Sequence, residues 1–387
     1  MKIVVDARRL RDFGIGTYIR NLVTAIAAID RENEYLLVSF PDDEVLLRHL
    51  PQNFRPIPCT RPDTDRVDHI AFPWLVRQLS ADITHIPLNR VPLFMPKPYV
   101  VTVHDMSTVL YKEGSPSAQS LRHYRLSRGL ARASRIIAVS SSTRRDIHTL
   151  TGIPEEEVRV IYNAPDPRFF EHGHLADARA AGPQAGDHER RRILERYQID
   201  YPFLLYAGNI RPQKNIPRLV EAFAVVKSEL KDDPRYDNLH LIIIGDTISK
   251  YPSVRRAVIQ SRVEHCVRFL GFVPFDTLRA FYELTTAFLF PSLYEGFGLP
   301  PLEAMAAGAP VLVSNTSSLP EVAGDAAIQV NPERVFDIAR GIRELLLNDQ
   351  LRAELVLRGR AHAASFSWSY AAEEVTRIYR EAAGRVR

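Results

Sequence analysis

The chain has 387 residues, of which 45% are hydrophobic and 25% charged, and it carries a net charge of +4. This length exceeds what one hydrophobic core usually organises, and the composition excludes disordered and fibrous proteins. The two cysteines match no metal-binding spacing, no apolar run reaches the roughly 18 residues of a membrane span, and the mild basic excess does not indicate nucleic-acid binding. We therefore expect a cytoplasmic, enzyme-like protein of two domains.

The first half of the chain alternates short apolar runs with helical patterns. A strand predicted at 2–5 is followed by a glycine-bearing loop and by apolar residues at helical spacing over 19–29. Further strands are predicted at 35–38, 83–87, 99–103, 136–139 and 158–162. Such alternation indicates a parallel sheet with crossover helices.

The same pattern restarts at a predicted strand over 203–206, with later strands at 240–244, 267–270, 287–290, 310–313 and 327–330. Two successive doubly wound α/β sheets are the simplest interpretation. We place the first domain at 1–170 and the second at 196–365. Between them, 171–195 is an exposed linker or insertion, because most of it lacks apolar periodicity.

The segment 290–310 carries the strongest functional signal. It ends a strand, makes a glycine-rich turn and starts a helix at the Pro-Pro pair 300–301. The amides at a helix N-terminus carry partial positive charge and favour a phosphate or another anionic oxygen. We expect this role for the amides of Phe297, Gly298 and Leu299.

Two carboxylates flank the turn, Glu295 before it and Glu303 in the predicted helix. A carboxylate beside the loop can contact a sugar, whereas one in the helix can accept hydrogen bonds from paired ribose hydroxyls. Their spacing alone does not separate these roles from those of solvated acids around a helix cap.

The residues between the glutamates distinguish these interpretations. Residues 292–304 read Ser-Leu-Tyr-Glu-Gly-Phe-Gly-Leu-Pro-Pro-Leu-Glu-Ala and resemble the signature of the large family 4 of retaining glycosyltransferases. The resemblance extends over nearly the whole chain. It implies the GT-B fold, in which two Rossmann-like doubly wound parallel-sheet domains face a central cleft, with the donor site in the second domain and the acceptor site mainly in the first. It also implies that 366–387 contains a helix that crosses back to the first domain.

The resemblance carries donor-binding roles to four residues. Lys214 and Arg211, in Gly-Asn-Ile-Arg-Pro-Gln-Lys-Asn, are expected to hold the diphosphate, and Glu303 to bind the nucleotide. The loop with Gly16 is expected to be flexible and to approach the donor phosphate.

Glu295 and His104 are the expected catalytic residues, placed to orient the sugar. Transfer builds positive charge on the sugar and negative charge on the departing diphosphate, so the protein must stabilise both. No nucleophile is identified, and retention without a metal or cofactor follows from the resemblance. The string Asp63-Thr64-Asp65 is the one candidate for Mg²⁺, and we interpret it as a solvated turn.

GDP-mannose is the favoured donor. The stretches 6–8, 14–16 and 212–215 are similar to bacterial mannosyltransferases that build surface polysaccharides. The acceptor would be a saccharide or a lipid-linked saccharide. The alternatives are a glycosyltransferase that uses UDP-glucose or UDP-N-acetylglucosamine, a nucleotide-sugar 2-epimerase of the same fold, and a protein that only binds. An NAD-dependent oxidoreductase is disfavoured by the incomplete glycine fingerprint.

One predicted helix carries a basic arc opposite Leu126, Leu130 and Ala133. A basic face of this kind suits an anionic membrane surface, where lipid-linked acceptors are displayed, and would place the protein peripherally at the inner face of the cytoplasmic membrane. A solvated face is the alternative. The arc consists of Arg122, Arg125, Arg128, Arg132 and Arg135.

Overall fold

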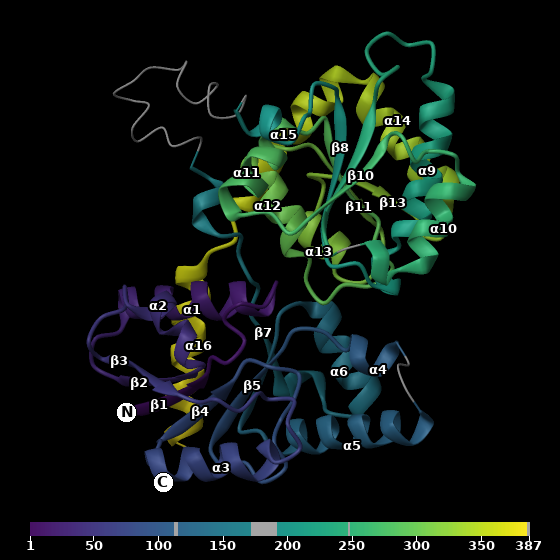
Figure 1. The fold of residues 1–387 in the computed structure, drawn as a ribbon. Coiled ribbons are helices and arrows are strands. Elements are labelled where there is room, and N and C mark those ends of the chain that lie inside the picture. The colour runs from purple at the N-terminus through teal and green to yellow at the C-terminus, as the bar shows by residue number, and fades with distance from the viewer. Residues whose placement is uncertain (112–114, 172–191, 247, 385–387) are drawn as a thin grey trace, which may run out of the picture. The chain divides into compact units, whose positions relative to one another are not determined.

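A computed structural model describes residues 1–111, 115–171, 192–246 and 248–384 (Figure 1). The chain divides into two compact units: the first comprises Met1–Asn163 and Ser367–Arg387, and the second Ala164–Phe366. The first boundary therefore falls at residue 163 rather than at 170. Most of the linker expected at 171–195 lies outside the described residues.

A parallel sheet of seven strands in the order β3-β2-β1-β4-β5-β6-β7 forms the centre of the first unit. Only β3 was not predicted, because its sequence Phe-Arg-Pro-Ile-Pro lacks an apolar pattern; prolines are tolerated there because β3 lies at the sheet edge. The strands are β1 Lys2–Asp6, β2 Glu34–Ser39, β3 Phe54–Pro58, β4 Ile83–Ile86, β5 Tyr99–Val103, β6 Arg135–Ala138 and β7 Val158–Val160.

Helices cover this sheet, whose central strands β4 and β5 are buried along their whole length, as in parallel sheets packed on both faces. The helix α16 belongs to this unit and packs against α1 (Figure 1). The helices are α1 Ile15–Ile29, α2 Glu44–Leu47, α3 Asp68–Leu79, α4 Ser107–Leu110, α5 Pro116–Arg132, α6 Ser141–Thr151 and α16 Trp368–Gly384.

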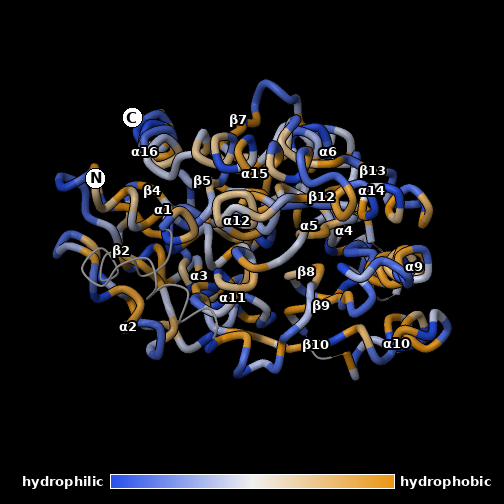
Figure 2. The backbone as a smooth tube through the Cα atoms, turned by 90° about the horizontal axis from the view of Figure 1, so that it is seen from above, coloured by the Kyte–Doolittle hydropathy of each residue, from blue (hydrophilic) through white to orange (hydrophobic). Residues whose placement is uncertain are grey.

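The second unit has a parallel sheet of six strands in the order β10-β9-β8-β11-β12-β13. Its strands are β8 Phe203–Gly208, β9 His240–Gly245, β10 Val267–Gly271, β11 Ala287–Phe290, β12 Val311–Ser314 and β13 Ile328–Val330. Its helices are α9 Ile216–Glu229, α10 Pro252–Gln260, α11 Phe275–Leu284, α12 Leu299–Ala307, α13 Leu319–Ala323, α14 Val335–Leu347 and α15 Asp349–Ala363. In Figure 2, α9 and α10 change between orange and blue within each turn, as helices with one apolar face do.

Both sheets reverse their direction of growth beside their first strand. The chain runs from β1 outward to β3 and then returns to place β4 beside β1, and it does the same with β8, β10 and β11. In open parallel sheets, ligands bind outside the carboxyl ends of the strands at such a switch point. The loops after β1, β4, β8 and β11 are therefore where a site is expected.

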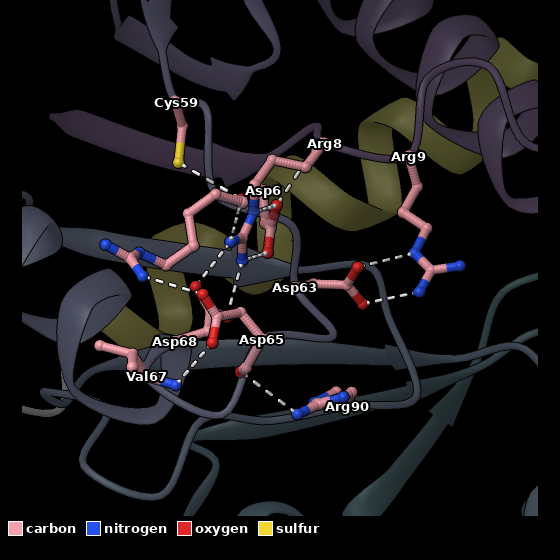
Figure 3. A network of polar contacts seen from close by, with 10 residues as sticks. Asp6, Arg8, Arg9, Cys59, Asp63, Asp65, Val67, Asp68 and Arg90 are labelled. Carbon is pink, nitrogen blue, oxygen red and sulfur yellow. Dashed lines mark hydrogen bonds and ion pairs between the residues drawn. The ribbon is translucent and has the colours of Figure 1, made fainter.

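The Asp63-Thr64-Asp65 string is not the solvated turn that the sequence suggested. Asp63 is 7% exposed, and its two carboxylate oxygens accept hydrogen bonds from Arg9 at 3.1 and 2.8 Å (Figure 3). Asp65 pairs with Arg61 at 2.8 Å. The counter-charge for Asp63 comes from a residue 54 positions earlier, which local sequence cannot reveal.

Next to Asp63 lies a fully buried ion-pair network around Arg8 (Figure 3). The guanidinium contacts Asp6 at 2.7 and 2.8 Å and Asp68 at 2.7 and 3.2 Å, and its Cζ lies 4.4 Å from the ring centroid of Phe72. Burial raises the pKa of the Asp68 carboxyl despite this partner. The Asp-Ala-Arg stretch at 6–8 thus joins the end of β1 to α3.

None of the helices in the described ranges is long and apolar enough to cross a membrane.

Candidate active site

An ion pair between Lys214 and Glu295 lies at the switch point of the second sheet. Lys214 ends the short 3-10 helix η4 (Pro212–Lys214) after β8, and Glu295 follows β11. The ammonium Nζ lies 2.6 Å from Oε1 and 2.8 Å from Oε2, and the two side chains are 17% and 11% exposed. The structure therefore joins the cation and the carboxylate that the sequence predicted separately.

The turn that carries Lys214 is fixed to the end of β11. Asn215 adopts a left-handed conformation with φ of 61°, and its side-chain amide donates to the carbonyls of Pro291 at 3.0 Å and Pro332 at 2.7 Å. The amide of Leu293 donates to the Gln213 carbonyl at 2.7 Å. These bonds hold the two loops together independently of the ion pair.

Two serines that the sequence did not single out hold the Glu295 backbone. Its N–H donates to Ser317 Oγ at 2.8 Å, and its carbonyl accepts from the hydroxyls of Ser317 and Ser318 at 2.9 Å each. Ser318 also donates to the Phe297 carbonyl at 2.8 Å. The only sequence signal was the polar run that follows a predicted strand ending at 313.

The glycine-rich turn leads into α12 as predicted. Gly298 is the N-cap residue, with φ of 109°. Because the Pro-Pro pair 300–301 has no N–H and the Leu302 N–H makes the first intrahelical hydrogen bond, the amide hydrogens outside the helix hydrogen bonds here are those of Gly298 and Leu299. The side chains of Phe297 and Leu299 are buried, so these residues can serve a ligand only through their backbone.

Glu303 lies in the second turn of α12. Its Oε2 accepts a hydrogen bond from Tyr282 Oη at 3.4 Å. Burial, together with this carboxylate, raises the pKa of Tyr282 well above its ordinary value, so the phenol remains a donor at neutral pH. Arg211, the other predicted diphosphate ligand, precedes η4 and has an exposed side chain.

In the first unit, His104 follows β5 at the carboxyl edge of the sheet. Its backbone N–H donates to Asn89 Oδ1 at 2.9 Å, and its Nε2 lies 3.1 Å from the Pro87 carbonyl. Because a carbonyl only accepts, Nε2 carries the proton and Nδ1 of the neutral ring is an acceptor. Burial lowers the pKa of His104 to about 4, which keeps the ring neutral at pH 7.

The loop before α1, which the resemblance describes as flexible, is extensively bonded. The Gly16 amide donates to the Asp12 carbonyl at 3.1 Å, and a Cβ at Gly16 would lie 2.5 Å from the Leu10 carbonyl oxygen. Arg9 pairs with Asp12 at 2.8 Å. Gly16, in the first turn of α1, is thus required for the close approach of this turn to the backbone of the preceding loop, whatever its role toward a donor.

The basic arc is only partly as predicted. Arg122, Arg128 and Arg132 are exposed on α5 and Arg125 is half-buried, but Arg135 begins β6, where it pairs with Glu381 of α16 at 3.3 Å. The predicted arc requires a helix that continues to residue 135, whereas α5 ends at residue 132.

Within the described parts of the chain, no three His, Cys, Asp or Glu side chains gather as metal ligands would. The metal-independent reaction remains a prediction.

Two family models match the chain. "Glycosyltransferase Family 4" matches residues 14–169, and "Glycosyl transferases group 1" matches residues 189–362. The chain is also 31% identical over 310 residues to O-antigen chain mannosyltransferase B of Escherichia coli. This match covers 79% of this chain and 76% of that protein. The chain belongs to the family 4 glycosyltransferases.

This glycosyltransferase resembles two further proteins. It is 33% identical over 288 residues to the serotype-specific mannosyltransferase WbdA of Escherichia coli, a match that covers 73% of this chain and 33% of WbdA. The structure of HepE from Anabaena in complex with UDP-glucose superposes with a TM-score of 0.76 at 17% identity, covering 98% of this chain and all of HepE. The family 4 glycosyltransferase therefore has the GT-B fold of two Rossmann-like domains.

Proposed function

We propose that this glycosyltransferase transfers mannose from GDP-mannose, with retention and without a metal, to a saccharide or lipid-linked saccharide during synthesis of a surface polysaccharide. The donor and pathway are supported by two relatives named mannosyltransferases, one of which acts on an O-antigen chain. The reaction is supported above all by the Lys214–Glu295 pair at the switch point, beside the N-terminus of α12.

The pair suggests how the donor is held. A diphosphate that binds at the start of α12 would compete with Glu295 for the ammonium of Lys214. Lys214 and the amides of Gly298 and Leu299 would then stabilise the charge of the leaving group, while the released Glu295 carboxylate faces the positive charge that develops on the sugar. With these groups supplying positive charge, the proposed reaction needs no Mg²⁺.

His104 contributes a different group. Its neutral ring offers Nδ1 as an acceptor, which suits a hydrogen bond from a sugar hydroxyl. Retention is tested by NMR of the anomeric configuration of the product, and a product inverted relative to the donor would contradict this part of the proposal.

GDP is expected to stabilise the protein more than UDP in a thermal-shift panel. At a concentration about 100 times its dissociation constant, a ligand that binds only the folded state adds about 2.7 kcal/mol. A shift with UDP but none with GDP would instead support a UDP-sugar donor, the kind of ligand with which HepE was solved.

Conversion of the donor in the absence of any acceptor, with a free epimerised sugar as product, would support the epimerase.

We also propose that α5 lies on an anionic membrane. Its exposed face combines apolar and basic side chains at helical spacing: Leu121 and Tyr124 are 46% and 56% exposed, Arg128 donates to Tyr124 Oη at 3.0 Å, and Arg132 follows one turn later. Apolar side chains that enter the headgroup region beside arginines that contact phosphates are typical of interfacial helices.

Replacing Arg128 and Arg132 together by Gln is expected to weaken binding to vesicles that contain phosphatidylglycerol by about 30-fold, at about 1 kcal/mol per arginine. Co-sedimentation with vesicles measures this. The control replaces Arg255 and Arg256, two exposed arginines of α10 in the second unit. If the wild-type protein bound pure phosphatidylcholine vesicles as well as vesicles that contain phosphatidylglycerol, the proposal would be rejected.

A further inference from the structure

A buried chain of hydrogen bonds crosses the first unit from α16 to α1. Tyr379 of α16 lies with its Oη 2.6 Å from Nδ1 of His85 on β4, whose Nε2 is 2.8 Å from Oγ1 of Thr102 on β5. Thr102 Oγ1 is in turn 3.0 Å from the Oη of Tyr18 on α1. These four residues, which we call the buried hydrogen-bond chain, are each at most 2% exposed.

The buried hydrogen-bond chain ends at Tyr18, and the aromatic ring of this residue packs against His104. The Tyr18 and His104 rings are T-shaped, with centroids 4.8 Å apart and planes at 82°. Trp368, the first residue of α16, also packs on Tyr18, with centroids 5.8 Å apart. The position of Tyr18 is therefore set by α16 in two ways, directly through Trp368 and indirectly through Tyr379.

The chemistry of His85 suits a link in such a chain. Burial lowers its pKa to about 3, so the ring is neutral, with one N–H and one acceptor nitrogen. One ring nitrogen can donate a hydrogen bond while the other accepts one, whichever way the hydrogen bonds of the buried hydrogen-bond chain are directed. Apolar side chains would fill this space without the need to satisfy four polar groups, whereas a hydrogen-bonded chain fixes distances and directions.

We propose that the buried hydrogen-bond chain positions the imidazole of His104, so that α16 supports the site through Tyr18 as well as completing the fold. The inference rests on the proposed function only for the role of His104 toward the sugar. The four residues of the buried hydrogen-bond chain are positioning residues, because they act through His104 and not on the substrate.

The first experiment observes His104 directly, by NMR of the protein labelled with ¹³C at histidine Cε1. The His104→Gln variant assigns the signal. Thr102→Val removes one hydroxyl and keeps the side-chain shape, and it is expected to shift or broaden the His104 signal. Tyr18→Phe keeps the ring and should act in the same way. An unchanged His104 signal in both variants would overturn the proposal.

The control for these variants is Tyr99→Phe. Tyr99 lies on β5 with Thr102 and is 1% exposed, and its hydroxyl donates to the Gly129 carbonyl at 2.7 Å. Its removal therefore also costs a buried hydrogen bond. We expect this variant to leave the His104 signal in place.

The second experiment measures transfer with GDP-mannose, or with the sugar of the nucleotide that the thermal-shift panel identifies. Thr102→Val and Tyr379→Phe should each lower kcat by about tenfold with the donor KM within about twofold, because small misplacements of catalytic groups are costly. Tyr99→Phe should keep kcat within about twofold at a similar loss of thermal stability. If all of these variants lose thermal stability alike and none has a lower kcat, the buried hydrogen-bond chain serves folding alone.

The His104→Ala variant separates the two proposals. Wild-type transfer by this variant would reject the role of His104 in the proposed function, while the NMR experiment would still decide whether the buried hydrogen-bond chain orients the ring. A strong loss in His104→Ala with full activity in Thr102→Val would reject the further inference only.

Discussion

Lys214→Met is expected to lower kcat for sugar transfer by about 10²–10³-fold, the effect of removing one group that stabilises charge in a transition state. Methionine keeps an unbranched apolar stem of similar length, but it removes the ammonium, whose Nζ lies 5.2 Å from the ring centroid of Phe290. What is lost is the positive charge that the leaving diphosphate needs. Initial rates of nucleotide release with the accepted donor measure the effect.

A second variant shows whether the pair acts as a unit. Glu295→Gln keeps the shape and removes the charge. Because the bound diphosphate separates the pair in the proposed mechanism, the double variant with Lys214→Met should lose about the product of the two single losses in kcat. Lys231→Met, at an exposed lysine of the same unit, is the control. A loss in the double variant much smaller than the product of the two single losses would show that the residues still act as one unit and would contradict the mechanism proposed above.

Arg8→Met is expected to lower the free energy of unfolding of the first unit by about 3–5 kcal/mol. The change leaves Asp6 and Asp68, with side chains 1% and 5% exposed, as buried carboxylates without their counter-charge. Urea unfolding followed by tryptophan fluorescence is a clean measurement, because both tryptophans of the chain, Trp74 and Trp368, belong to the first unit.

The control for Arg8 is Arg55→Met in the same unit. Arg55 pairs with Glu34, but its side chain is 62% exposed, and exposed pairs contribute about 0–1 kcal/mol. A loss for Arg8→Met no larger than that for Arg55→Met would mean that the network contributes little to stability.

Much of the fold could be predicted because its strands are apolar runs bounded by turn residues. This holds for β5, which is buried along its whole length, and for α12, whose Pro-Pro start and Gly308 stop are visible in the sequence. The prediction from apolar runs fails for β3, where exposure at the sheet edge removes the apolar pattern. It also fails at Arg135, because periodicity does not mark the end of α5 sharply.

The structure pairs two of the predicted site residues through a contact that the sequence does not predict. Lys214 and Glu295 stand at motif positions, yet their pairing joins residues 81 positions apart and depends on how β8 and β11 are placed in the sheet. Asp63 was misjudged for the same reason, since its partner Arg9 is supplied by another loop. Buried polar partners such as Tyr282 and His85 carry no sequence signal distinct from that of core residues.

The division of the chain into units has a consequence for its synthesis. The second unit is one continuous stretch, Ala164–Phe366, whereas the first is made of two stretches that lie on either side of it in the sequence. The ribosome therefore releases all of the second unit before α16, and domains generally fold as units as they emerge. His85 is synthesised 294 residues before its hydrogen-bond partner Tyr379. Synthesis of the first unit therefore begins before that of the second unit but ends after it.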